Sequence, residues 1–160
     1  MRTRNFRWTR AWLWAATLGT ALCLMPPALA VGLSLRVQLV WGTYDAKPKE
    51  AKYEVLEANT RDKLARVFKW KNYFVIHQQK VSLAPRGGSK RLRLSSKCEI
   101  ELKYVDDGTL EIKLFGEGKW TKTVRQSVKA FNQGELAVLA GDDKEHYNDA
   151  WFVVLAAVSP

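Results

Sequence analysis

The feature that most constrains the fold of this chain is an alternation of apolar and polar side chains beyond residue 32. The first segment with this pattern is "LSLRVQLVW", in which Leu33 and every second residue to Trp41 are apolar. A period of two places successive side chains on opposite faces of a strand, so this segment is expected to bury one face. It is predicted to be the first strand of a β-rich domain.

The strand pattern returns near residue 73 and continues to the C-terminus in short segments. We expect strands at 73–79, 80–83, 90–94, 98–105, 109–115, 120–128, 135–139 and 150–157. Turn-forming residues such as Asp107, Gly108, Gly116 and Gly118 separate them. Many short strands without intervening helices predict a mainly β, antiparallel sandwich, of which an immunoglobulin-like arrangement is one form. The last strand is apolar on both faces, which predicts a central position in its sheet.

The segment 45–68 has a different character, because it contains few strand-forming residues. Asn59 or Thr60 is a suitable N-cap, and Leu64, Val67 and Phe68 fall on one helical face beyond it. We therefore expect a short helical segment after the first strand, either one broken helix or two short helices.

The first thirty residues have the three parts of a signal peptide: four early arginines, an apolar run at 11–25, and "ALA" at Ala28–Ala30. The apolar run makes a helix of about 22 Å, shorter than the roughly 30 Å hydrocarbon core of a bilayer. We therefore predict a signal peptide at 1–30, a single β-rich domain at 31–160, and no transmembrane anchor after cleavage. The expected location is the periplasm or the exterior, and an uncleaved signal that holds the chain at the inner membrane is the alternative.

The chain is basic, with 26 Lys and Arg against 16 Asp and Glu and a formal charge of +10. Export argues against nucleic acid as the natural partner. Clustered positive charge attracts anions, so the basic segment at 85–93 is a candidate contact for an anionic envelope component or another envelope protein. The residues of this anionic-partner contact are Arg86, Lys90, Arg91 and Arg93. The alternative is that these charges discourage pairing between sheet edges.

Cys98 is the one cysteine outside the predicted signal peptide, and it alternates in phase with Ile100, Leu102 and Tyr104. A cysteine on an apolar face packs as a small hydrophobic residue, and burial raises the pKa of its thiol. We therefore expect Cys98 to be a core residue and predict no catalytic residue, no metal ligand and no cofactor. The alternative is a small periplasmic hydrolase or metal-binding protein that uses Cys98 or the acidic loop Asp142–Asp149, with His77 and His146 as the available histidines.

Six stretches resemble a group of small exported bacterial proteins of unknown function. They are "LVWGT" at 39–43, "FKWKNYF" at 68–74, "KCEIELK" at 97–103, "FGEGK" at 115–119, "LAGDDK" at 139–144 and "AWFVVL" at 150–155. The resemblance implies a signal peptide followed by one β-rich domain, and it implies no activity, cofactor or active residue. Together with the absence of a catalytic pattern, it predicts an exported, non-enzymatic binding or assembly module of the cell envelope.

Overall fold

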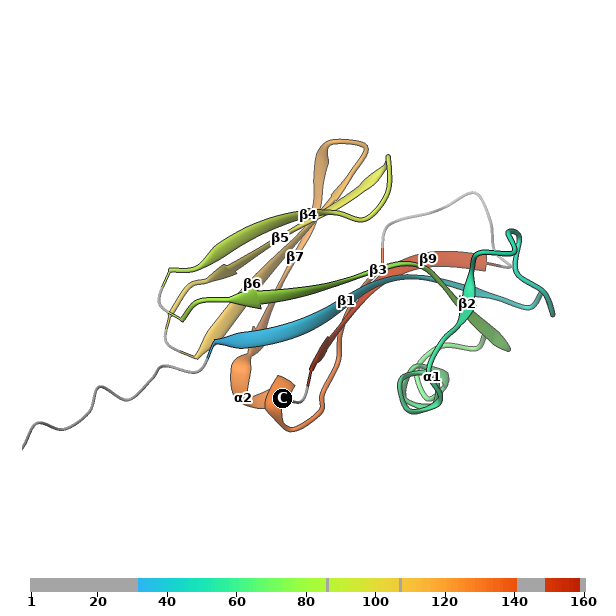
Figure 1. Cartoon of the computed structure of the whole chain (residues 1–160), viewed down its shortest axis with the longest axis horizontal. Coiled ribbons are helices and arrows are strands. Elements are labelled where there is room, and N and C mark those ends of the chain that lie inside the picture. Colours follow the sequence, from blue (N-terminus) through green and yellow to red (C-terminus); the bar gives the residue numbers. More distant parts are fainter. Residues whose placement is uncertain (1–31, 86, 107, 141–148, 159–160) are drawn as a thin grey trace, which may run out of the picture.

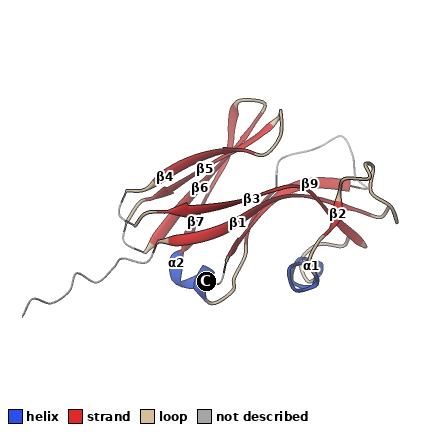
Figure 2. Ribbon diagram, viewed as in Figure 1, coloured by secondary structure: helices blue, strands red, loops and turns tan. Residues whose placement is uncertain are grey.

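The computed structural model describes residues 32–85, 87–106, 108–140 and 149–158, and its secondary structure is mainly β (Figures 1 and 2). In chain order the elements are β1 (Leu33–Thr43), β2 (Glu54–Val55), α1 (Ala58–Ala65), β3 (Asn72–Leu83), β4 (Ser89–Arg93), β5 (Cys98–Tyr104), β6 (Thr109–Gly116), β7 (Lys119–Ser127), α2 (Val128–Asn132), β8 (Ala137–Ala140) and β9 (Asp149–Ala157). The predicted signal peptide at 1–30 lies outside the described residues.

The strands form two antiparallel sheets. Sheet A has five strands in the order β2-β3-β1-β9-β8, and sheet B has four strands in the order β4-β5-β6-β7. The central position predicted for the last strand is confirmed, because β9 lies between β1 and β8. Its residues are apolar on both faces because both faces are buried: Val153 and Leu155 belong to one apolar cluster and Phe152 and Val154 to the other.

One apolar core is shared by the facing sides of the two sheets. Leu35, Val37 and Leu39 of β1 belong to the same buried cluster as Ile100 of β5 and Ile112 of β6. Phe131 of α2, which is fully buried, completes this cluster on the side where the chain passes from sheet B back to sheet A. The prediction of a mainly β chain with antiparallel sheets is therefore confirmed.

The opposite face of sheet A carries a second apolar cluster, which lies beneath α1. Leu56 and Leu64 are buried there with Val40, Tyr73 and Phe152. Figure 1 shows α1 on the side of sheet A that is turned away from sheet B. Sheet A is therefore covered on both faces over part of its area.

The helical segments differ in detail from the sequence pattern. Within 45–68 the structure has the two-residue strand β2 followed by α1, and the residue that precedes α1 is Glu57, whose side chain makes no capping hydrogen bond. The expected strand at 120–128 ends one residue earlier, and the chain then forms α2. The Ser127 side chain accepts a hydrogen bond from the backbone N–H of Lys129, which starts this helix. A capping serine before an apolar turn was the sequence signal for α2.

The segments expected at 73–79 and 80–83 form one strand, β3. Its register against β1 shifts between Leu39 and Val40, where Ile76 is the extra residue. The polar run at 77–80 interrupts the apolar pattern in the middle of β3, which is why the sequence suggested two strands.

Candidate functional site

The outer face of sheet B carries a group of charged side chains that could meet a partner. Cross-strand partners point to the same side of a sheet, so the register of β4 to β7 defines this face. We call it the charged face; its residues are Arg91, Arg93, Glu99, Glu101, Lys103, Glu111, Lys113, Phe115, Trp120 and Arg125. The opposite side of the same strands is the apolar core.

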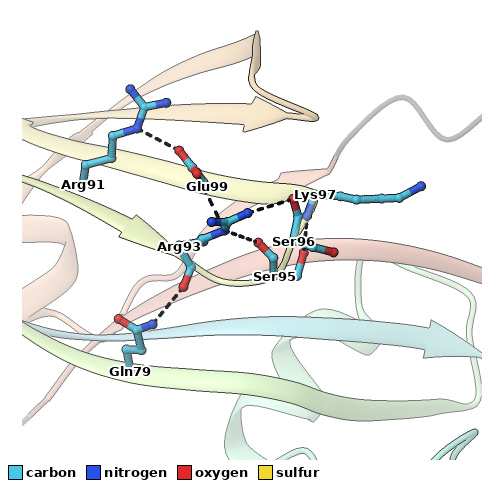
Figure 3. Close-up of polar contacts among 7 residues, drawn as sticks. All are labelled: Gln79, Arg91, Arg93, Ser95, Ser96, Lys97 and Glu99. Atoms are coloured by element: carbon cyan, nitrogen blue, oxygen red, sulfur yellow. Dashed lines mark hydrogen bonds and ion pairs between the residues drawn. The ribbon is translucent and has the colours of Figure 1, made fainter.

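Arg91 and Arg93 of β4 both reach toward Glu99 of β5 (Figure 3). The Arg91 Nε donates to Glu99 Oε2 at 2.9 Å, and Arg93 Nε lies 3.9 Å from Glu99 Oε1. The Arg91 guanidinium also lies 4.3 Å from the centroid of the Phe115 ring, within the range of a cation–π contact. Both guanidinium groups are therefore held in place by neighbours on the charged face and remain largely exposed.

Arg93 also ties the turn after β4 to its own strand and to sheet A. Its guanidinium donates to the carbonyl oxygens of Ser95 and Ser96 at 3.3 and 3.5 Å. Its carbonyl oxygen accepts a hydrogen bond from Gln79 Nε2 of β3 at 2.9 Å. Figure 3 shows Gln79 reaching from one sheet to the other. It does so on the side where β4 is an edge strand and where β3 runs beyond its short pairing with β2.

The structure brings three of the four predicted basic residues together on β4. Lys90 is exposed and makes no ion pair with any described residue, whereas Arg91 and Arg93 share Glu99. The fourth residue, Arg86, lies outside the described residues. The described part of the predicted contact is therefore the edge strand β4, with Lys90 unpaired and the guanidinium groups of Arg91 and Arg93 held in place.

Glu111 is the most enclosed carboxylate of the charged face, with 8% of its surface exposed. Arg125 donates to Glu111 Oε2 from Nε at 2.9 Å and from Nη2 at 2.8 Å, and Lys113 lies 3.4 Å from the other oxygen. The hydrogen bonds from Arg125 are the main reason that the pKa of Glu111 lies below its usual value of 4.5, and Lys113 acts in the same direction. This pair fixes β6 to β7 and is already satisfied without a ligand.

Cys98 opens β5 and packs against the shared core. Burial raises the pKa of its thiol from 9.0 to about 11, and the neighbouring Glu99 adds to the shift. In the described part of the chain the thiol makes no hydrogen bond to His77, whose Nε2 lies 2.8 Å from Gln79 Nε2. A cysteine nucleophile needs a lowered pKa and a nearby base, so this arrangement is that of a packing residue.

The predicted acidic loop Asp142–Asp149, with His146, lies outside the described residues except for Asp149. The Asp149 carboxylate accepts a hydrogen bond from Trp41 Nε1 at 2.9 Å and pairs with Lys49 at 3.0 Å. The Lys49 ammonium also lies 4.5 Å from the centroid of the Trp41 ring. These contacts anchor the start of β9 to β1.

Two hairpin turns of sheet B contact each other, and the sequence did not predict this contact. The "GEGK" stretch is the tight turn between β6 and β7, as expected, with Glu117 and Gly118 both at positive φ (49° and 79°). The Glu117 side chain pairs with Lys97 of the β4–β5 turn at 3.1 Å, and its backbone N–H donates to the Lys97 carbonyl at 2.8 Å. Trp120 follows the turn with 63% of its surface exposed. The signal was present: Phe115 and Trp120 flank the glycine turn as cross-strand partners.

A depression of about 220 Å³ lies beside β2, at the other end of the molecule. Arg61 and Lys71 line it together with Tyr73 and Phe74. Arg61 is already paired with Asp62 at 3.0 Å, and the two aromatic side chains are buried core residues. The depression therefore holds no set of groups with an evident chemical task.

Across the described residues, no group of three or more His, Cys, Asp or Glu side chains is placed to hold a metal ion. Within the same ranges, no helix has the length and apolar character needed to cross a bilayer. Comparison of the chain with protein-family models, with curated proteins and with solved structures gave no significant match. The arguments about function therefore rest on the chain's own geometry.

Proposed function

We propose that this chain is an exported, non-enzymatic binding or assembly module of the bacterial cell envelope that contacts an envelope protein or an anionic envelope component. The observation that carries the proposal is the charge balance of the charged face and the adjoining edge of β4. On the charged face cations outnumber carboxylates: Arg91, Arg93, Lys103, Lys113 and Arg125 stand against Glu99, Glu101 and Glu111. Lys90 adds a further cation on the other side of β4. A surplus of positive charge on one surface raises the local concentration of anionic partners.

The ion pairs of this surface favour recognition over simple solvation. Arg91 is held between Glu99 and the Phe115 ring, so its guanidinium has lost much of its rotational freedom before any partner arrives. Less side-chain entropy then remains to be lost when a partner binds. A guanidinium with free N–H groups in a fixed position suits carboxylate or phosphate oxygens.

The experiment is chemical crosslinking in intact cells, followed by mass spectrometry of what the chain captures. It is run on the wild type and on Arg91→Ser/Arg93→Ser, with and without a salt wash. The matched control is Arg66→Ser/Lys69→Ser, which removes the same charge from exposed positions that follow α1. We expect a discrete partner that the β4 variant loses and the control retains, and a loss on salt washing, because exposed charges are screened.

Capture of the same partner by wild type and β4 variant would contradict the role of the basic edge. A saturable enzymatic turnover that disappears in Cys98→Ala or His77→Ala would contradict the non-enzymatic character of the proposal. Intact mass of the exported chain tests the signal peptide, since removal of residues 1–30 leaves no anchor of that kind.

Two finer expectations belong to this proposal. The immunoglobulin-like form of the sandwich stays a prediction, and sheet B is a meander of consecutive strands, whereas immunoglobulin sandwiches have Greek-key connections. The resemblance to small exported bacterial proteins likewise stays a prediction.

A further inference from the structure

Trp120 is the one large aromatic residue of sheet B that the described structure leaves mostly in solvent, at 63% exposure. Its indole Nε1 donates to Thr123 Oγ1 at 3.0 Å, so the polar atom of the ring is satisfied and an apolar surface faces outward. Phe115 is its cross-strand partner. Aromatic side chains with one satisfied polar atom and a wide apolar face are typical of membrane–water interfaces.

Two lysines lie close to this tryptophan in the sequence, at the tip of the β6–β7 hairpin. Lys119 and Lys122 flank it in the sequence, and both are exposed without an ion pair to any described residue. The one acid of the turn, Glu117, is already paired with Lys97. The cross-strand partners of the lysines are Gly116 and Leu114, whereas that of Trp120 is Phe115, so the lysines point to the opposite side of the hairpin from the indole. The tip therefore presents an exposed apolar ring on one side and unpaired positive charge on the other.

The tip is also a rigid projection. The backbone hydrogen bond and the ion pair between Glu117 and Lys97 join the β4–β5 and β6–β7 turns, and the Gly116 N–H donates to Thr121 Oγ1 at 3.1 Å. In Figure 1 the two turns extend together beyond the body of the molecule. A projecting tip can meet a flat surface without steric conflict from the rest of the chain.

We propose that the joined tips of the β4–β5 and β6–β7 hairpins bind the surface of an anionic lipid bilayer, with Trp120 at the interface and Lys119 and Lys122 against lipid phosphates. The inference rests on the proposed export to the envelope and names one anionic component for this part of the molecule. A cation near an anionic membrane surface contributes about 1 kcal/mol, and a buried aromatic ring adds an apolar contribution. Together they give reversible attachment and not insertion.

The test is co-sedimentation of the exported chain, whose intact mass shows the loss of residues 1–30. It is run with vesicles of mixed phosphatidylcholine and phosphatidylglycerol and with vesicles of phosphatidylcholine alone. We expect binding to the mixed vesicles that falls with added salt. Lys119→Ser/Lys122→Ser should weaken partitioning by about five-fold for each lysine, and Trp120→Ala by about ten-fold. All three positions are exposed, so thermal unfolding should be unchanged in these variants.

The chain offers a closely matched control. Arg66, Val67 and Lys69 repeat the spacing of Lys119, Trp120 and Lys122, and Val67 is 75% exposed. Arg66→Ser/Lys69→Ser and Val67→Ala should bind the mixed vesicles as the wild type does. Brominated lipids should quench tryptophan emission in the wild type, and Trp120→Phe should lose most of this quenching because Trp41 is fully buried and Trp70 and Trp151 are partly buried.

Absence of binding to the mixed vesicles would overturn the inference, as would equal loss in the control variants. Binding that is independent of Trp120 and equally strong to a soluble polyanion would also overturn it. If the chain does not bind vesicles but still captures a protein partner in cells, the proposed function stands and only the lipid inference fails. If the chain binds vesicles but Arg91→Ser/Arg93→Ser does not change what is captured in cells, only the proposed contact at β4 is contradicted.

Discussion

The faces of the two sheets that point away from the shared core differ in their side chains and in what covers them. Sheet B turns a lattice of charged side chains toward solvent, with Arg91, Glu99, Glu111 and Arg125 joined in ion pairs. Sheet A turns aromatic and aliphatic side chains outward and covers part of them with α1 and the segment that follows it. The comparison shows that a sheet face needs a helix over it only where its side chains cannot be solvated.

Phe152 lies at the centre of the aromatic cluster on the outer face of sheet A. The Phe152 ring lies 5.3 Å from the Phe68 ring and 5.7 Å from the Trp70 ring, and both pairs are stacked. Tyr73 meets Phe152 edge to face at 6.3 Å. Offset stacking and edge contacts are the favourable arrangements of aromatic rings, so this cluster joins the covering segment to the sheet.

We expect the largest change in stability from removing the Phe152 side chain. Phe152→Ala removes a side chain with 1% exposure from the stack and should lower the free energy of unfolding by about 3 to 5 kcal/mol. Urea unfolding followed by fluorescence measures it. Phe115→Ala on the charged face is the comparison variant, and a loss of equal size there would break the contrast between the two faces.

The inner side of sheet B should be as inaccessible to chemistry as the aromatic cluster. With its pKa raised to about 11, the Cys98 thiol carries about a hundred-fold less thiolate near neutral pH than a thiol at the ordinary 9.0. We expect slow modification by a maleimide in the native chain and fast modification in urea. Rapid native labelling would show that Cys98 is a reactive surface group and would reopen the hydrolase alternative.

A smaller effect should follow from crowding the aromatic cluster. A Cβ at Gly42 would lie 2.6 Å from Trp70 Cε3 and 3.1 Å from Phe152 Cε1. Gly42→Ala should therefore destabilise the fold by about 1 to 3 kcal/mol. The control is Gly108→Ala, where the nearest atom is 3.9 Å away and no strain is expected. Equal unfolding midpoints for the two variants would mean that the covering segment is not packed closely on β1.

The smallest effect concerns the charged face and depends on pH. Because the folded pKa of Glu111 lies below 4.5, its charge stabilises the fold at neutral pH, and this contribution is lost as pH falls through the lowered value. Glu111→Gln should therefore flatten the acidic limb of a plot of unfolding midpoint against pH. Glu54→Gln, at an exposed position on β2, is the control. An unchanged acidic limb in Glu111→Gln would show that the Arg125 pair contributes nothing.

The strands were largely predictable because the order of apolar and polar residues in a strand depends on which of its faces are buried. The alternation in β5 follows from one face meeting the core and the other being partly or fully exposed, and this holds whatever the partner strand is. In β1 the expectation of one buried face holds only for its first residues, because from Val37 onward both faces are buried. The fully apolar β9 similarly indicated a central position. The helices were less predictable, because α1 has few apolar positions and α2 has only five residues. Both are stabilised by what they cover more than by their own periodicity.

The sequence alone determined most strand segments, the turns between them and the inward orientation of Cys98, since these depend on neighbours along the chain. It did not reveal β2 or the continuity of β3. Only the tertiary structure decided that Arg91 and Arg93 share one carboxylate and that two hairpin turns join at one tip, which carries Trp120 and unpaired lysines. Those arrangements depend on register and on contacts between separate strands. No local pattern encodes them, because the free energy of each contact arises from groups that meet only after the sheets have formed.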